Sequence, residues 1–171
     1  WPGERAADFW RDVLARPARY VRRAGDTLAR IATEGCIRPS GRHLAAGACC
    51  VAFTACSVTE SLPLMKWRRR YVEYSFEPWG IALRRNAVEN IGGEGVMYTE
   101  ADGSDGNPVY THSPGENGLW MREREWRVPG DVALGSIHPE DVLLLVPGME
   151  DRKWIQSLVP DRYEVHHIFS D

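Results

Sequence analysis

The sequence LWMREREWRVPGD occupies residues 119–131, directly after a polar segment rich in glycine. Its alternating pattern and the Pro-Gly-Asp turn at its end predict a β-strand. Because alternate residues of a strand share a face, we expect Glu123, Glu125 and Arg127 to point the same way. Two carboxylates beside a guanidinium are typical either of a polar functional site or of a charged sheet surface that faces water.

The composition is that of a folded globular protein. The chain has 171 residues, of which 43% are hydrophobic and 26% charged, which is enough for one domain with its own core. The formal net charge of −3 excludes a global basic field of the kind that drives bulk nucleic-acid binding. No internal repeat or linker is recognisable, so we predict that residues 1–171 form a single domain. The chain begins at Trp1 rather than Met, and we expect a trimmed or processed form.

The four cysteines predict free thiols rather than a metal site. Cys49 and Cys50 are adjacent and would point to opposite faces of a strand, and no C-x-x-C pair is present, so we expect no metal. Apolar neighbours favour buried free thiols, which fits the reducing cytoplasm. No apolar run is long enough to span a membrane and no secretory signal is recognisable. We therefore predict a cytoplasmic protein without a membrane partner.

Hydrophobic periodicity and turn residues predict short helices and short strands without a regular alternation. We expect helices at residues 5–15, 28–34, 84–91 and 150–158, and strands at residues 19–23, 49–54, 79–83, 95–99, 119–131, 142–146 and 163–169. Asp26 or Thr27 is expected to cap the second helix, and Gly35 to end it. The pattern predicts an α+β fold with bent, mostly antiparallel sheets and short N-terminal helices.

Two further segments carry functional information. Residues 66–71, which read KWRRRY, form a dense basic cluster with aromatic neighbours. That composition is typical of sites for phosphates or stacked bases, and a solvated helix face fits it as well. Residues 100–118 are polar and rich in Gly, Asp and Pro. A connection of this length is typical of a functional loop.

Familiar catalytic motifs are absent. The sequence contains no G-x-x-x-x-G-K-[ST], G-x-G-x-x-G or G-x-S-x-G, the patterns of phosphate, dinucleotide and acyl-transfer sites. His166 and His167 alternate across a strand and lack the spacing of metal ligands. His43, His112 and His138 lie in or beside loops. Two of them could supply the acid and base of a metal-independent nuclease, which stays open as an alternative.

A carboxylate strand, an early arginine pair and a set of aromatic residues remain. Cleavage of the bond between nicotinamide and ribose passes through an oxocarbenium-like state, which a carboxylate stabilises. An arginine such as Arg22 or Arg23 can hold a pyrophosphate in a bidentate grip. Aromatic rings can hold the flat nicotinamide. These residues favour an enzyme that uses NAD as its substrate.

Several segments resemble, in the same order, the abortive-infection (AbiGi-like) proteins of bacterial defence islands. They are residues 20–28 with 31 and 35–40, residues 51–54 with 57–64, residues 70–71 with 79–81 and 95–98, and residues 124–131. The same layout is similar to DarT-like ADP-ribosyltransferases, in which a strand, a helix ending in glycine and a buried strand precede a late strand with a glutamate. The resemblance covers residues 20–147 and implies an ADP-ribosyltransferase-like fold.

The resemblance also implies roles for individual residues. Glu125 would be the catalytic glutamate, and Glu123, the first glutamate of an E-x-E pattern, would help activate and orient the acceptor. The implied contacts with NAD come from Arg22 or Arg23 in the early strand and from Phe53 and Thr54 in the second. Trp79 is a further candidate for contact with NAD, with packing in the core as its alternative.

The function implied is that of a NAD-dependent mono-ADP-ribosyltransferase that modifies a protein or a nucleic acid. Such a protein would be a bacterial toxin or phage-defence effector, with an antitoxin as a candidate partner. The alternative is a non-catalytic module of a defence system that binds a nucleotide or nucleic acid through residues 66–71. That module predicts binding that weakens steeply with salt and no consumption of NAD.

Overall fold

The computed structural model describes residues 23–41, 44, 48–64, 67–68, 73–74, 77–99, 109–115, 118 and 120–169. The chain divides into two compact units. Unit 1 comprises residues 1–34, 57–82 and 139–171, and unit 2 comprises residues 35–56 and 83–138. Each unit combines segments that are distant in the sequence. The prediction that residues 1–171 form a single domain stays a prediction.

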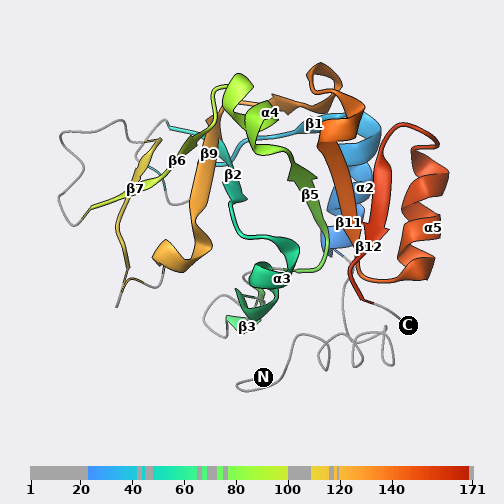
Figure 1. Cartoon of the computed structure of the whole chain (residues 1–171), viewed down its shortest axis with the longest axis horizontal. Helices are drawn as coiled ribbons and strands as arrows, with labels where there is room; N and C mark the ends of the chain where they lie inside the picture. The colour runs from blue at the N-terminus through green and yellow to red at the C-terminus, as the bar shows by residue number, and fades with distance from the viewer. Residues whose placement is uncertain are drawn as a thin grey trace. The chain divides into compact units, whose positions relative to one another are not determined.

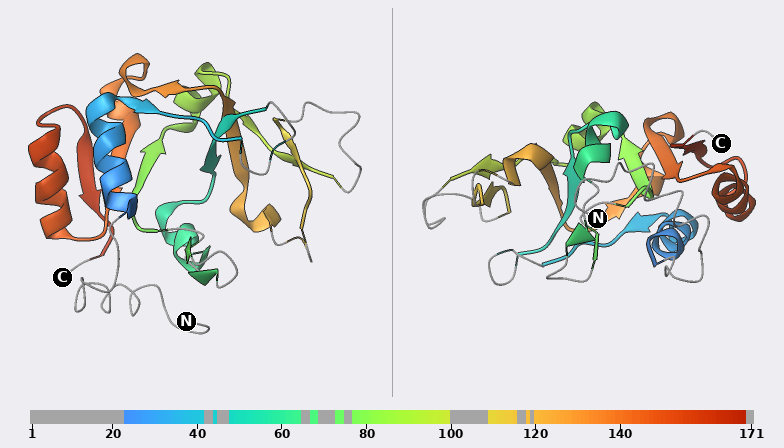
Figure 2. Two further views of the ribbon diagram at one scale, coloured as in Figure 1. Left: turned by 180° about the vertical axis from the view of Figure 1, so that it is seen from behind. Right: turned by 90° about the horizontal axis from the view of Figure 1, so that it is seen from below.

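Unit 1 is built on a three-stranded sheet with the strand order β12-β11-β5. Its main elements are α2 (Arg23–Glu34), β5 (Gly80–Leu83), β11 (Val142–Val146), α5 (Met149–Leu158) and β12 (Glu164–His167). β11 and β12 run parallel. The two helices lie next to each other, as the left view of Figure 2 shows.

The core of unit 1 consists of aliphatic side chains from the sheet and both helices. Side chains without exposed surface come from α2, β11, α5 and β12, namely Ala32, Leu144, Val146, Ile155 and Val165. Leu28, one helical turn before Ala32, is 3% exposed. Residues four apart share a helix face, so α2 presents this apolar face to the core.

Smaller elements complete unit 1: α3 (Val58–Ser61), η2 (Leu62–Leu64), β3 (Trp67–Arg68), β4 (Glu73–Tyr74) and η6 (Pro139–Asp141). The start of α3 is fixed by a capping box, in which the Ser57 hydroxyl accepts from the Glu60 N–H and the Glu60 carboxylate accepts from the Ser57 N–H. These two bonds satisfy main-chain donors that a helix start leaves free. β3 and β4 pair as an antiparallel ribbon.

Unit 2 is built on the sheet β2-β9-β6, whose strands lie side by side in Figure 1. These strands, β2 (Cys50–Thr54), β9 (Glu125–Pro129) and β6 (Glu94–Gly95), are antiparallel to their neighbours. β1 (Cys36–Ile37) pairs antiparallel with β10 (Val132–Ala133), and β7 (Met97–Tyr98) pairs parallel with β8 (Thr111–His112). Three short helices complete the unit: α4 (Arg85–Asn90), η4 (Trp120–Glu123) and η5 (Leu134–Ser136).

The β2-β9 pair has two chemically different faces, because side chains alternate along each strand. The apolar face carries Val51, Phe53, Trp126 and Val128, and the polar face carries Ala52, Thr54, Glu125 and Arg127. Helix α4 packs close to the apolar face. A Cβ at Gly93 would lie 2.4 Å from Cγ1 of Val88 in α4 and 3.1 Å from Cγ2 of Val128, so only glycine fits between them.

The described elements confirm a mixture of a few helices with mostly antiparallel strand pairs. The strand expected at residues 49–54 and the helices expected at residues 84–91 and 150–158 are present within one or two residues. Gly35 follows α2 with a φ of 69°, as expected of a residue that ends a helix. The helix expected at residues 5–15 lies outside the described residues.

Other expectations about local structure are wrong. Arg23 was expected in a strand but begins α2, and residues 19–22 lie outside the described part of the chain. Asp26 and Thr27 lie inside α2 rather than capping it. Residues 119–131 do not form one strand: η4 ends at Glu123, Arg124 has a φ of 45°, and β9 begins at the next residue.

Candidate functional site

The polar face of unit 2 brings Thr54 and Glu125 together. The two residues are partners in the register of the antiparallel β2-β9 pair, in which Ala52 is the partner of Arg127. Directly opposite residues of such a pair carry their side chains on the same face, with Cβ atoms about 5 Å apart. The prediction that Glu125 and Arg127 share a strand face is therefore confirmed, and Thr54 lies on that face with them.

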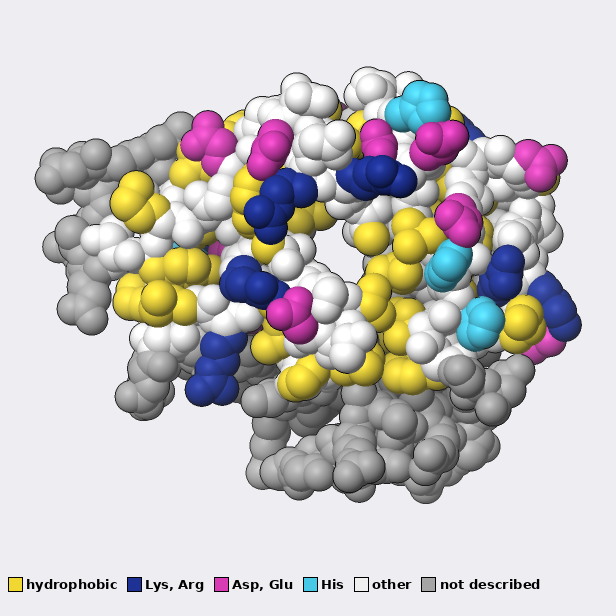
Figure 3. Space-filling view, viewed as in Figure 1, with side chains coloured by type: hydrophobic (Ala, Val, Ile, Leu, Met, Phe, Trp, Pro, Cys, Tyr) yellow, Lys and Arg dark blue, Asp and Glu magenta, His cyan; other side chains and the backbone are white. Residues whose placement is uncertain are grey.

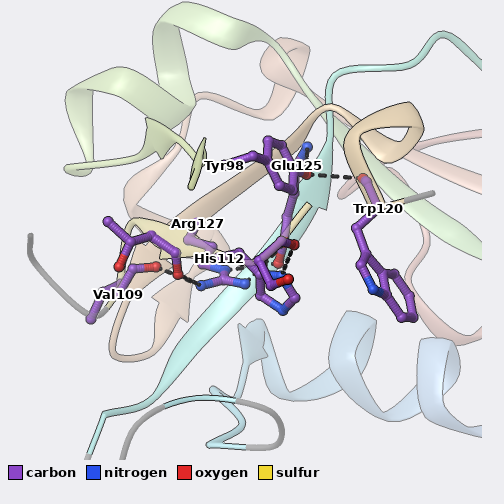
Figure 4. A network of polar contacts seen from close by, with 8 residues as sticks. Tyr98, Val109, His112, Trp120, Glu125 and Arg127 are labelled. Atoms are coloured by element: carbon purple, nitrogen blue, oxygen red, sulfur yellow. Dashed lines mark hydrogen bonds and ion pairs between the residues drawn. The ribbon is translucent and has the colours of Figure 1, made fainter. Parts of the chain in front are cut away.

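Arg127 connects the polar face to the segment that leads into β8 (Figure 4). Its Nε donates to Oε1 of Glu125 at 2.8 Å, and its Nη2 donates to Oε2 of the same carboxylate at 3.0 Å. Two parallel bonds of this kind form the bidentate geometry of strong arginine–carboxylate pairs. Nη1 donates to the main-chain carbonyls of Val109 at 2.9 Å and Thr111 at 3.3 Å.

The two members of this ion pair differ in their exposure to water. Arg127 is only 2% exposed, and a buried charge is tolerated only where opposite charge and hydrogen bonds replace its hydration. Glu125 and the two carbonyls provide that replacement. The Glu125 side chain is 19% exposed. The Glu125 carboxylate is therefore anchored by a buried guanidinium, while its side chain as a whole is not fully enclosed.

The hydroxyl of Tyr98 ties the main chain of Glu125 to η4. It donates to the carbonyl of Trp120 at 3.0 Å and accepts from the N–H of Glu125 at 3.4 Å. Burial is the main cause of a raised pKa at Tyr98, and the negative charge of Glu125 raises this pKa further, against the effect of the hydrogen bond from the Glu125 N–H. The hydroxyl therefore keeps its proton and continues to donate at neutral pH.

Three rings, from Tyr98, His112 and Trp120, form a cluster beside Glu125 that we call the aromatic trio (Figure 4). The His112 ring stands edge-on to the other two, with centroids 6.4 Å from Tyr98 and 6.2 Å from Trp120. Edge-to-face packing of this kind is favourable. Nδ1 of His112 lies 2.7 Å from the carbonyl of Ser113. Because a carbonyl only accepts, this contact requires the proton on Nδ1.

Glu123 does not share a strand with Glu125. It is the last residue of η4, and the left-handed conformation of Arg124 separates it from β9. Two contacts with the end of β2 hold this turn: the Thr54 hydroxyl donates to the carbonyl of Glu123, and the N–H of Ala55 donates to the carbonyl of Arg124. The prediction that Glu123 and Glu125 lie on one strand face is wrong, because this turn breaks the alternation.

Phe53 lies on the apolar face, away from Glu125. It is the partner of Trp126 in the strand register, and the guanidinium of Arg85 lies over the Trp126 ring, 5.4 Å from its centroid. Adjacent residues of a strand point to opposite faces, so Phe53 and Thr54 do not serve the same site. The structure groups Thr54 with Glu125 and separates Phe53 from them.

The remaining predicted site residues belong to unit 1. Trp79 packs edge-on against Trp154 of α5, with ring centroids 6.0 Å apart. A Cβ at Gly25 of α2 would lie 3.1 Å from the Trp79 ring. These contacts give Trp79 the packing role that was its alternative. Arg23 is the first residue of α2, and Arg22 lies outside the described residues.

Sequence reasoning missed the aromatic trio as a neighbourhood of Glu125. Tyr98, His112 and Trp120 come from β7, β8 and η4, and nothing in their sequence positions connects them. Arg127 had a detectable signal, because it lies two residues after Glu125 on a strand. The burial of Arg127 had no such signal in the sequence, because the segment that accepts its hydrogen bonds, residues 109–111, is distant from it in the chain and meets β9 only in the folded structure.

Two further properties concern the described residues alone. They contain no group of three or more His, Cys, Asp or Glu side chains that could hold a metal ion. None of their helices has both the length and the apolar character needed to cross a membrane. On the face drawn in Figure 3, Lys and Arg side chains are interspersed with Asp and Glu. Of the basic cluster at residues 66–71, Trp67 and Arg68 are described, as strand β3.

No protein-family model, curated protein or solved structure matches this chain.

Proposed function

We propose that this chain is a NAD-dependent mono-ADP-ribosyltransferase-like domain that modifies a protein or a nucleic acid, as a bacterial toxin or phage-defence effector. The observation that carries the proposal is Glu125, which has a carboxylate anchored by Arg127, a partly exposed side chain and Thr54 as its partner on the neighbouring strand. A fixed carboxylate of this kind stabilises the oxocarbenium-like state through which such cleavage passes. The resemblance to AbiGi-like and DarT-like proteins supports the same function.

In the proposed reaction the bond between nicotinamide and C1′ of the ribose breaks, and nicotinamide leaves with the bonding electron pair. Glu125 stabilises the positive charge that develops on the ribose and accepts a hydrogen bond from a ribose hydroxyl. A nucleophilic atom of the acceptor, or the oxygen of water where no acceptor is present, then bonds to C1′ and loses its proton. Preorganised charge lowers the barrier because it needs no reorganisation during the reaction. The bidentate contact with Arg127 provides this preorganisation.

The surroundings of Glu125 suit the other parts of NAD. The aromatic trio offers flat surfaces for the nicotinamide ring, within the contact network that includes the main chain of Glu125. Arg22 or Arg23 stays a candidate for the pyrophosphate on the resemblance alone. Glu123 stays a candidate for orienting the acceptor, from η4 rather than from the strand.

The test is calorimetric titration with NAD, followed by detection of released nicotinamide. Glu125→Gln keeps an amide oxygen that can accept from Arg127, so it is expected to fold with reduced stability, because the buried guanidinium loses its charged partner, and to abolish release. Glu94→Gln is the matched control, because Glu94 is an exposed carboxylate on β6 of the same sheet, and it is expected to retain release. NAD binding without release by the wild-type protein would indicate a domain that binds NAD but does not cleave it. Absence of NAD binding would overturn the proposal.

A non-catalytic nucleic-acid-binding module is the competing function. The basic cluster at residues 66–71, on which this function would depend, overlaps the β3-β4 ribbon. In this ribbon Trp67 is the partner of Tyr74, and Arg68 is the partner of Glu73. A short ribbon with aromatic and basic residues suits stacking and phosphate contacts. This function predicts that binding of single-stranded DNA or RNA falls linearly with salt on a double logarithmic plot, and that NAD is not consumed.

A further inference from the structure

Arg127 stands out among the charged residues of the described chain. With Asp151 it is one of the two that are buried there. Each of its three guanidinium nitrogen atoms donates a hydrogen bond within unit 2. A guanidinium occupied in this way is poorly placed to grip a substrate phosphate. Its contacts instead point to a role exerted on the protein's own groups.

The choice of partner carboxylate is informative. Glu94 of β6 is the Cα partner of Arg127 across the strand pair, and Glu125 lies two residues earlier on the same strand face. Both carboxylates are therefore near, and charge pairing alone could be met by either. The guanidinium binds both oxygen atoms of Glu125, at 2.8 and 3.0 Å. This fork fixes the plane of the carboxylate as well as its distance, which a single contact does not do.

The guanidinium is itself fixed from its other side. The carbonyls of Val109 and Thr111 accept from Nη1, and β8 is paired with β7, since the N–H of Thr99 donates to the carbonyl of His112. Rotation of the Arg127 side chain would break these bonds in a buried environment, which is costly. The orientation of the Glu125 carboxylate is therefore determined by the main chain at residues 109–111.

We infer that Arg127 is the positioning residue for Glu125, and that it orients the carboxylate by bridging it to the main chain of Val109 and Thr111. The inference rests on the proposed function and deepens it by assigning the residue on which the catalytic geometry depends. Lysine keeps the positive charge but has a single donor atom on a flexible chain. The substitution Arg127→Lys therefore separates the effect of positive charge near Glu125 from the effect of a fixed carboxylate orientation.

The expected signature is a fall in kcat without a matching change in KM. A carboxylate in the wrong orientation stabilises the transition state less well and leaves ground-state binding of NAD nearly unchanged. We expect Arg127→Lys to reduce kcat for nicotinamide release about 10- to 100-fold, the usual cost of a disturbed supporting residue or a displacement of about 1 Å. In Arg127→Ala, added guanidinium ion at millimolar concentration is expected to restore part of kcat, because it can occupy the vacated space.

The experiment measures steady-state nicotinamide release by the wild type, Arg127→Lys, Arg127→Ala and the control Arg85→Ala, with folding checked by thermal melts. Arg85 is an exposed arginine of the same unit, beside Trp126, and its variant is expected to keep the wild-type kcat. A lower kcat in Arg127→Lys at unchanged KM, or rescue of Arg127→Ala by guanidinium, supports the inference. An active wild type whose Arg127→Lys variant keeps its kcat, or changes only KM, overturns the inference and leaves the proposed function intact. An inactive wild type overturns both. If neither Arg127 variant folds, Arg127 is a structural residue and the inference is overturned.

Discussion

Replacing Arg127 with methionine should destabilise unit 2 far more than a surface ion pair would. The substitution leaves the Glu125 carboxylate, 19% exposed, without its bidentate partner, and removing one member of a buried pair costs about 3–5 kcal/mol. It also removes two hydrogen bonds to main-chain carbonyls, each worth about 1 kcal/mol. Water that reaches the partly exposed Glu125 side chain offsets part of this loss. We expect a net loss of about 4 kcal/mol, a large share of a typical stability of about 5–15 kcal/mol.

The assay is urea denaturation followed by circular dichroism. With a slope of about 2 kcal/mol/M, a loss of about 4 kcal/mol lowers the unfolding midpoint by about 2 M. The double variant Glu125→Met/Arg127→Met is expected to recover much of the loss, because replacing both members of a buried pair by apolar groups is often neutral. Arg85→Met is the matched control, and loss of its contact with Trp126 should cost about 0.5–1 kcal/mol.

A loss below about 1 kcal/mol for Arg127→Met would refute this reasoning, because that is the range of solvent-exposed pairs. A Glu125→Met/Arg127→Met variant that is no more stable than Arg127→Met would also refute this reasoning. It would show that the cost does not come from an unpaired carboxylate.

Three further predictions concern other parts of unit 2. Gly93→Ala should lower the free energy of unfolding by about 1–3 kcal/mol through overpacking, whereas Gly95→Ala, whose Cβ would meet its nearest neighbour at 3.5 Å, should change it by less than about 0.5 kcal/mol; equal shifts in thermal melts would contradict this packing. Burial raises the pKa of the Cys50 thiol, so iodoacetamide should label Cys50 more slowly than the exposed Cys49, and the labelling of Cys50 should become faster only at alkaline pH. Faster labelling of Cys50 than of Cys49, measured by peptide mass spectrometry, would argue against its burial. The pKa of Tyr98 is raised in the folded state, so the protonated hydroxyl contributes to stability in full below about pH 9, and this contribution declines as the pH rises past about 10, the ordinary tyrosine value. The difference in free energy of unfolding between the wild type and Tyr98→Phe, measured in urea, should therefore narrow at high pH, and a constant difference would count against this linkage.

The sequence predicts those features of the site that depend on short-range periodicity. Glu125 and Arg127 are two residues apart on a strand, and that spacing alone places them on one face. The same rule separates the neighbours Phe53 and Thr54, although both were candidates for contact with NAD. In the observed register, Thr54 lies on the same face as Glu125, and Phe53 lies on the opposite face, away from the candidate site.

The sequence does not predict features that depend on long-range contacts. Glu123 leaves the strand because Arg124 has a positive φ, which is uncommon for residues other than glycine and carries no signal in its sequence. The Thr54 hydroxyl and the Ala55 N–H, from β2 and the residue after it, hold that turn. In the same way, Arg127 is buried by a segment almost twenty positions earlier in the chain. Propensity and periodicity describe neighbours in sequence, whereas these contacts join neighbours in space.

The most direct test of the central claim is the rate of nicotinamide release from NAD by the wild-type protein, Glu125→Gln and Glu94→Gln measured side by side. All three proteins are expected to give the same circular dichroism spectrum at the assay temperature, with a lower unfolding midpoint for Glu125→Gln because the buried Arg127 loses its charged partner. If the Glu125 carboxylate stabilises the ribosyl cation, the wild type and Glu94→Gln release nicotinamide, and Glu125→Gln, which keeps the shape but loses the charge, does not. Release by Glu125→Gln at the wild-type rate would contradict the account.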